Sequence, residues 1–125
     1  MAHMKITAVL IVENIEKSLP FWVERMGFEK TVEVPEGDRL GFVILVRDRA
    51  ELMLQTTASV EKDQPQFEGL ITNTALFIEV EDFADILQRL EGYTISIPEH
   101  LTFYGMREIG VRDPDNNIVT FAARA

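Results

Sequence analysis

Few side chains in this chain of 125 residues have the chemistry needed for catalysis or metal binding. The sequence has no cysteine and only two histidines, His3 and His100, so a thiolate site is excluded and an imidazole cluster has little to draw on. No nucleophile-base-acid arrangement, phosphate-binding loop or paired-cysteine motif is present. The best candidates are two carboxylates in strand-like stretches, Glu51 and Glu79, which are suited to recognising a cation. Such carboxylates are also often simply solvated.

Three more candidates lie in or beside a predicted loop. Phe103 and Tyr104 precede Gly105 and can stack on an aromatic ligand, but they can equally anchor the loop to the core. Arg107 can meet an anionic group or pair with a neighbouring acid. The lone loop residue His100 is expected to be solvated or to cap a neighbouring element, because a single histidine seldom forms a metal site.

Hydrophobic patterning predicts the elements that position these residues in the first half. Residues 5–12 are apolar and β-branched, which predicts a strand covered on both faces. Asn14 then predicts the N-cap of a helix over 15–26, with Pro20 bending it and Gly27 ending it. Three more strands are predicted over 28–34, 39–47 and 50–56.

The second half repeats this order after a polar connector, residues 57–73, that has room for a short helical turn. A strand over 74–80 leads to Asp82 as N-cap and to a helix over 83–91. A short strand over 93–97, a loop and a hairpin with arms 106–112 and 118–123 follow. The two halves overlay in order and in caps, with Leu10, Val12, Asn14, Ile15 and Leu19 matching Ile78, Val80, Asp82, Phe83 and Leu87. An internal repeat of this kind is a strong indication of fold.

Composition narrows the possible partners. The chain is 46% hydrophobic and 26% charged, as expected of one globular domain. Its net charge of −9 argues against nucleic acid and against an anionic membrane surface. The charge fits a cationic small-molecule ligand, although it can serve solubility alone. No membrane-spanning run or signal peptide is visible, so a cytoplasmic location is expected.

Two segments carry a family resemblance: residues 12–22 with Met26-Gly27-Phe28, and residues 105–108 through the turn 113–117. The first is similar to a helix that ends in an aromatic pair and Leu-Gly-Phe. The second is similar to an Asp-Pro-Asp-Gly-Asn turn, with Asn116 in place of glycine. Together they resemble the vicinal oxygen chelate superfamily, which includes glyoxalase I, the bleomycin-resistance proteins and the extradiol dioxygenases.

The resemblance implies an α+β fold of two tandem βαβββ modules whose curled sheets enclose a cavity. Residues 1–3 are interpreted as a cloning remnant and residues 4–125 as a single domain. Within it, module one covers about 4–56, the connector 57–73 and module two 74–125.

The superfamily's enzymes hold a divalent metal with one side chain from the first and last strand of each module. The corresponding positions here are Thr7, Ala75, Thr120 and either Met53 or Glu51. Hydroxyl, methyl and thioether groups do not make such a site, which requires imidazole or carboxylate, and one carboxylate at Glu51 cannot hold a catalytic divalent ion by itself. The resemblance therefore predicts that the metal centre has been lost, and no cofactor is expected.

The same strand faces would line a largely apolar cavity suited to a small molecule. The alternative is that these side chains simply fill a closed core. The predicted ligand-binding residues are Thr7, Val9, Glu51, Met53, Gln55, Phe77, Glu79, Phe103, Tyr104, Arg107 and Thr120.

Two functional hypotheses follow from the resemblance. The first is a metal-free binding protein of the bleomycin-resistance type, which sequesters an aromatic or cationic compound in the cavity between the modules without catalysing a reaction. The second is a glyoxalase- or dioxygenase-like enzyme with an atypical metal site around Glu51 or a metal-free acid or base such as Glu79. A homodimer is expected, with the modules pairing either within one chain or across two.

Overall fold

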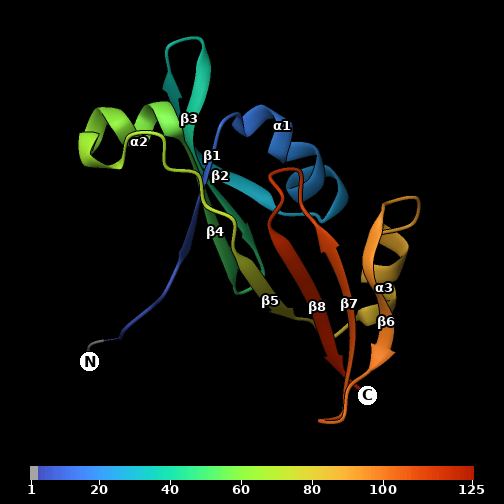
Figure 1. Ribbon diagram of the computed structural model, residues 1–125. Helices are drawn as coiled ribbons and strands as arrows, with labels where there is room; N and C mark the ends of the chain where they lie inside the picture. Colours follow the sequence, from blue (N-terminus) through green and yellow to red (C-terminus); the bar gives the residue numbers. More distant parts are fainter. Residues whose placement is uncertain (1–2) are drawn as a thin grey trace. The chain divides into compact units, whose positions relative to one another are not determined.

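The structure is a computed structural model that describes residues 3–125, so residues 1–2 of the predicted cloning remnant lie outside it (Figure 1). In chain order the elements are β1 (Ala8–Val12), α1 (Ile15–Leu19), the π-helix η1 (Pro20–Arg25), β2 (Glu29–Glu36), β3 (Arg39–Arg47), β4 (Ala50–Thr56), α2 (Thr57–Asp63), the 3-10 helix η2 (Pro65–Phe67), β5 (Ala75–Glu79), α3 (Phe83–Arg89), β6 (Ile95–Leu101), β7 (Met106–Arg112) and β8 (Ile118–Arg124). None of the helices in residues 3–125 is long and apolar enough to cross a membrane.

The strands form two mixed sheets, one in each of two compact units, Met1–Thr72 and Asn73–Ala125. The strand order is β1-β4-β3-β2 in the first sheet and β5-β8-β7-β6 in the second. In each sheet the strand that comes first along the chain pairs in parallel with the strand that comes last: β1 with β4, and β5 with β8. The remaining strand pairs are antiparallel. The same connectivity occurs twice, which confirms the predicted α+β fold of two βαβββ modules.

The helix after β1 begins where the sequence predicts. The side chain of Asn14 accepts a hydrogen bond from the backbone N–H of Lys17, as an N-cap does. At Pro20 the α-helix gives way to the π-helix η1, because proline lacks the N–H that would continue the α-helical ladder. Gly27, with φ of 78°, then ends the helical segment in left-handed geometry.

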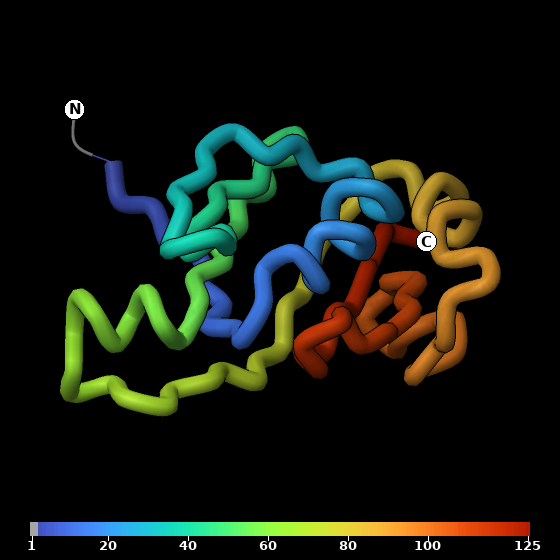
Figure 2. Tube along the Cα trace, turned by 90° about the horizontal axis from the view of Figure 1, so that it is seen from above, coloured from blue at the N-terminus to red at the C-terminus, as the bar shows by residue number. Residues whose placement is uncertain are grey.

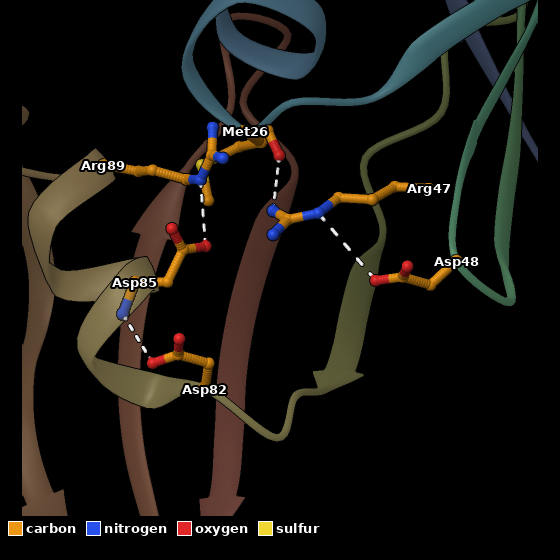
Figure 3. Close-up of polar contacts among 6 residues, drawn as sticks. All are labelled: Met26, Arg47, Asp48, Asp82, Asp85 and Arg89. Atoms are coloured by element: carbon orange, nitrogen blue, oxygen red, sulfur yellow. Dashed lines mark hydrogen bonds and ion pairs between the residues drawn. The ribbon is translucent and has the colours of Figure 1, made fainter.

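The core of the first unit lies between the helical segment and one face of its sheet. Leucines and valines that alternate along β1, β3 and β4 are buried on that face: Leu10, Val12, Val43, Leu45, Leu52 and Leu54. At the end of η1, the Arg47 guanidinium donates to the carbonyl of Met26 at 2.6 Å and links the helix to β3 (Figure 3).

The strand predicted over residues 5–12 is shorter than expected, and the prediction that it is covered on both faces is wrong. It begins at Ala8 and forms the edge of its sheet, and the side chain of Val9 is 41% exposed. A run of β-branched residues favours a strand, but it does not say whether both faces are packed.

In the second unit, the Asp82 carboxylate accepts from the backbone N–H of Asp85 and caps α3 as predicted (Figure 3). Phe83, Ile86 and Leu90 on this helical segment are buried, as are Val119 and Phe121 on β8. The turn between β7 and β8 is held by the buried pair Asp113 and Asn117, with Asn116 in left-handed geometry at φ of 67°.

The sixth strand corrects the expected loop. The sequence predicts a short strand over 93–97 and places Pro98 and His100 in a loop, but β6 runs from Ile95 to Leu101. Proline is tolerated there because β6 is the outermost strand of its sheet, where a missing N–H breaks no ladder.

The connector contains more structure than a helical turn. Figure 2 follows the chain out through α2 and back along residues 64–72. At the end of this path Thr72 bonds to the free edge of β1, where its hydroxyl accepts from the Ile11 N–H at 2.9 Å. The connector therefore covers part of an edge that would otherwise be exposed.

Candidate functional site

The first sheet has a second face, here called open face 1, which carries three rows of side chains in register. One row is Val9, Met53, Ile44 and Val32, and the next is Ile11, Gln55, Phe42 and Val34. The third contains Glu51 and Val46. All ten side chains are half-buried or exposed, and eight of them are apolar. The strand register therefore brings the predicted residues Val9, Glu51, Met53 and Gln55 onto one largely apolar surface.

The polar groups on open face 1 already have partners. Glu51 forms an ion pair with Lys5, and the Gln55 amide donates to the Ser59 hydroxyl at 3.1 Å. Thr7 precedes β1 and is half-buried. Because Lys5 balances its charge, Glu51 is a weaker candidate for recognising a cation than the sequence suggests.

The corresponding surface in the second unit, open face 2, is the side of the sheet opposite the buried Val119 and Phe121 on β8. Phe77 pairs with Thr120, which in turn pairs with Gly110. Glu79 and Glu108 flank Ala122 on either side. The Phe77 side chain is 56% exposed, and Ile118 beside it is also exposed. The predicted residues Phe77, Glu79 and Thr120 therefore share one face.

Gly110 has a steric role on this face. A Cβ atom there would lie 3.0 Å from the Ile97 side chain, which crosses over the glycine. The absence of a side chain at Gly110 thus lets β6 bring Ile97 close to the sheet.

The remaining predicted residues are placed differently. Arg107 belongs to the opposite face of β7, where its guanidinium pairs with Glu99 at 2.7 Å. Phe103 and Tyr104 lie in the turn between β6 and β7 and contact each other edge to face, with ring centroids 5.1 Å apart. Phe103 is fully exposed and so does not anchor the turn to the core.

The structure also brings together two polar residues, Glu108 and His100, that were absent from the predicted site. Glu108, on the central strand β7, is only 7% exposed. It accepts a hydrogen bond from the Tyr104 hydroxyl, and the His100 ring Nε2 lies 3.8 Å from its other oxygen. The hydrogen bond to Glu108 is the main cause that raises the pKa of Tyr104 above its ordinary value, because it favours the protonated phenol. The available signal in the sequence was a carboxylate at a strand position whose same-face neighbours, Met106 and Gly110, carry no polar side chain.

The donor chemistry of the metal positions does not fit a divalent ion. The positions that the resemblance assigns to a metal are Ala75 and Thr120 in the second unit, and Thr7 with Met53 or Glu51 in the first. Within residues 3–125, no three His, Cys, Asp or Glu side chains lie together in a way that could hold a metal ion.

Comparison with known families supports the resemblance seen in the sequence. The family model described as Glyoxalase/Bleomycin resistance protein/Dioxygenase superfamily matches residues 2–121. No curated protein matches the chain significantly.

Solved structures share the fold over nearly their whole length. A lactoylglutathione lyase from Agrobacterium tumefaciens is 16% identical with a TM-score of 0.76, covering 98% of this chain and 94% of its own. A bleomycin-binding protein from Streptomyces verticillus, complexed with copper(II)-bleomycin, is 24% identical with a TM-score of 0.67, and the match covers 100% and 99% of the two chains. TnmS3, an antibiotic binding protein from Streptomyces sp. CB03234, is 19% identical with a TM-score of 0.72, with the same coverage.

Proposed function

The chain belongs to the glyoxalase/bleomycin resistance protein/dioxygenase superfamily, and from that premise we propose that it is a metal-free protein that binds and sequesters a small aromatic or cationic molecule. Solved relatives by fold include both a lyase and drug-binding proteins, so the fold alone does not choose between catalysis and binding. The choice rests on the side chains of the two open faces.

One observation carries the proposal: large apolar side chains remain exposed on both open faces, and Glu51 and Gln55 are the only polar residues among the ten described on open face 1. Phe77 is 56% exposed on open face 2, and Val9 is 41% exposed on open face 1. A contiguous apolar patch that is exposed to solvent often marks a site of interaction. Small-molecule sites in particular are mainly apolar, with a few polar groups.

Binding without chemistry requires only that the ligand buries this surface. Each 100 Å² of apolar area removed from water contributes about 2.5 kcal/mol before the costs of association. Strand side chains in fixed register lose little freedom on binding, which favours affinity. An exposed carboxylate such as Glu79 would add preference for a positively charged ligand.

The test is a thermal-shift screen followed by calorimetry. The probes are bleomycin, doxorubicin and the planar pair acridine and 9-aminoacridine, which at pH 7.5 are neutral and cationic respectively. We expect at least one probe to raise the melting temperature and to bind with one-to-one stoichiometry.

Matched aromatic substitutions then separate the site from the general surface. Phe77→Ala is expected to lower the affinity for the probe about tenfold or more, since it removes an exposed ring from open face 2. Phe67→Ala removes a ring of similar exposure from η2 and should leave the affinity unchanged. The proposal fails if no probe binds, or if both variants weaken binding equally.

A further inference from the structure

Glu108 is a buried carboxylate whose charge is poorly balanced. Its side chain is 9% exposed, and the central strand β7 holds it on open face 2. Its contacts within residues 3–125 are the neutral hydroxyl of Tyr104, which donates to it, and the ring of His100. Burying a carboxylate costs free energy unless hydrogen bonds and an opposite charge compensate.

His100 can supply that charge only when its ring carries two protons. Its Nδ1 lies 2.9 Å from the carbonyl oxygen of Pro98, and a carbonyl can only accept, so Nδ1 is the donor. In the neutral ring Nε2 then has no proton, and it faces the Glu108 oxygen with a lone pair. A second proton on His100 changes this repulsive contact into an ion pair.

The other charged groups on open face 2 do not replace His100. From β5, Glu79 lies two strands away across Ala122 and adds negative charge. From β8, Arg124 pairs with Met106 in the register, and from β7, Arg112 donates to Asn116. Within the described chain, neither arginine comes within 4.0 Å of the Glu108 carboxylate, and His100 is the sole cationic partner at that range.

We propose that Glu108, framed by Tyr104 and His100, is the binding site for an ammonium or guanidinium group, and that a proton on His100 competes with this cation for the carboxylate. The His100 side chain is 44% exposed, so a ligand cation can displace the ring and reach the buried oxygen. Phe103 and Tyr104 present aromatic surface to the same ligand, where a cation gains further attraction from a ring face. The inference rests on the proposed function for the ligand's ring system, but the cation site is tested by itself.

The first experiment uses methylguanidinium as a bare cation and follows the His100 ring by NMR during a pH titration. At matched ionic strength, 50 mM methylguanidinium chloride is expected to lower the His100 titration midpoint relative to sodium chloride, because it competes with the proton. Glu108→Gln, which keeps an acceptor for Tyr104, should abolish the response to methylguanidinium. Glu91→Gln removes an exposed carboxylate just after α3 and should keep the response.

The second experiment uses ethidium, whose positive charge does not depend on pH. Ethidium is expected to bind severalfold more weakly at pH 5.5 than at pH 7.5. His100→Gln should remove this pH dependence, and Glu108→Gln should weaken binding about tenfold at pH 7.5.

The two hypotheses fail in different ways. If no aromatic probe binds, the proposed function fails, and the response of His100 to methylguanidinium still decides whether the cation site exists. The cation site at Glu108 is overturned if methylguanidinium does not change the midpoint of the His100 titration, or if ethidium binds the wild type and Glu108→Gln equally. The proposed binding function stands in either case.

Discussion

Individual carboxylates in this protein differ in what balances their charge. Glu51 is paired with Lys5 and Glu99 with Arg107, so both are already neutralised by a neighbour. Glu79 is exposed and forms no ion pair within the described residues, and Glu108 is buried beside a histidine. These glutamates therefore differ in how readily they can bind a cationic ligand, because they differ in the cation that the protein itself places beside the carboxylate.

This difference predicts an unequal response to alanine substitution. Glu79→Ala is expected to weaken the binding of 9-aminoacridine about two- to fivefold, which is the range for one partly solvated charge pair. Glu51→Ala should have a smaller effect, since it releases Lys5 and removes little net charge from open face 1. Calorimetry at pH 7.5 measures both affinities. A larger loss for Glu51→Ala would contradict the assignment.

The hydrogen bond between Tyr104 and Glu108 predicts a pH effect. The pKa of Tyr104 is raised chiefly by this bond, so Glu108→Gln should lower it toward the ordinary tyrosine value. Because the folded pKa is raised, the bond's contribution to stability is complete below the unfolded tyrosine pKa and is lost as pH rises through the folded pKa. Absorbance at 295 nm measures the titration, and Tyr93→Phe provides a background with Tyr104 as the one tyrosine. An unchanged midpoint in Glu108→Gln would show that the bond does not control the phenol.

At the level of elements, the turn between β7 and β8 is held together by side-chain hydrogen bonds. The Asn117 amide nitrogen donates to both carboxylate oxygens of Asp113, and its amide oxygen accepts from the Thr74 N–H at 2.9 Å. Asn117 thereby joins the hairpin to the residue before β5. The turn sets the register of β8 and hence the positions of Ile118 and Thr120 on open face 2.

Asn117→Ala is therefore expected to lower the free energy of unfolding by about 1–3 kcal/mol, because it removes the side-chain donor to the buried Asp113 Oδ2 and the acceptor of the Thr74 N–H. Urea denaturation followed by circular dichroism measures the change. The control is Asn73→Ala, an exposed asparagine in the adjoining segment, which should stay within about 0.5 kcal/mol of wild type. Equal losses in the two variants would contradict a special role for the turn.

For the whole molecule, the superfamily assigns the fold, and the chain's own side chains decide the chemistry. The positions that the resemblance assigns to a metal site carry Thr7, Ala75, Thr120 and either Met53 or Glu51, and the net charge is −9. A protein with this charge attracts cations over distances comparable to the screening length of the solution. A binding role for a cationic molecule is consistent with both features.

Metal content tests the whole-molecule proposal directly. Protein purified without chelator is expected to contain zinc, iron, nickel and manganese well below one equivalent by elemental analysis. Dialysis against EDTA should leave the affinity for 9-aminoacridine unchanged. One equivalent of any of these metals, lost together with binding on dialysis, would favour the enzyme hypothesis.

Ionic strength provides a second test at this scale. Raising sodium chloride from 50 to 500 mM is expected to weaken the binding of 9-aminoacridine severalfold. The binding of neutral acridine should stay nearly unchanged, since salt screens only the charged interaction. Calorimetry on both compounds measures the difference. Equal salt sensitivity would show that the cation is not recognised by charge.

The sequence alone determined those features that depend on local chemistry. The caps at Asn14 and Asp82, the interruption at Pro20 and the Asp113–Asn117 turn follow from side chains that bond to their own backbone neighbours. The repeat of these signals identified two βαβββ modules, and the residues at the positions that the resemblance assigns to a metal, with at most one carboxylate among them, predict that the metal centre has been lost.

Tertiary structure decided which charges meet, because that depends on strand register and on contacts between residues far apart in the chain. Lys5 reaches Glu51, and β6 extends far enough to carry His100 alongside Glu108. Period-two alternation places Glu108 on a face but does not reveal that Tyr104 and His100 are its neighbours. The distribution of charge on the candidate site is thus a property of the folded sheet, since pairing across strands is what brings these groups within a few ångströms of one another.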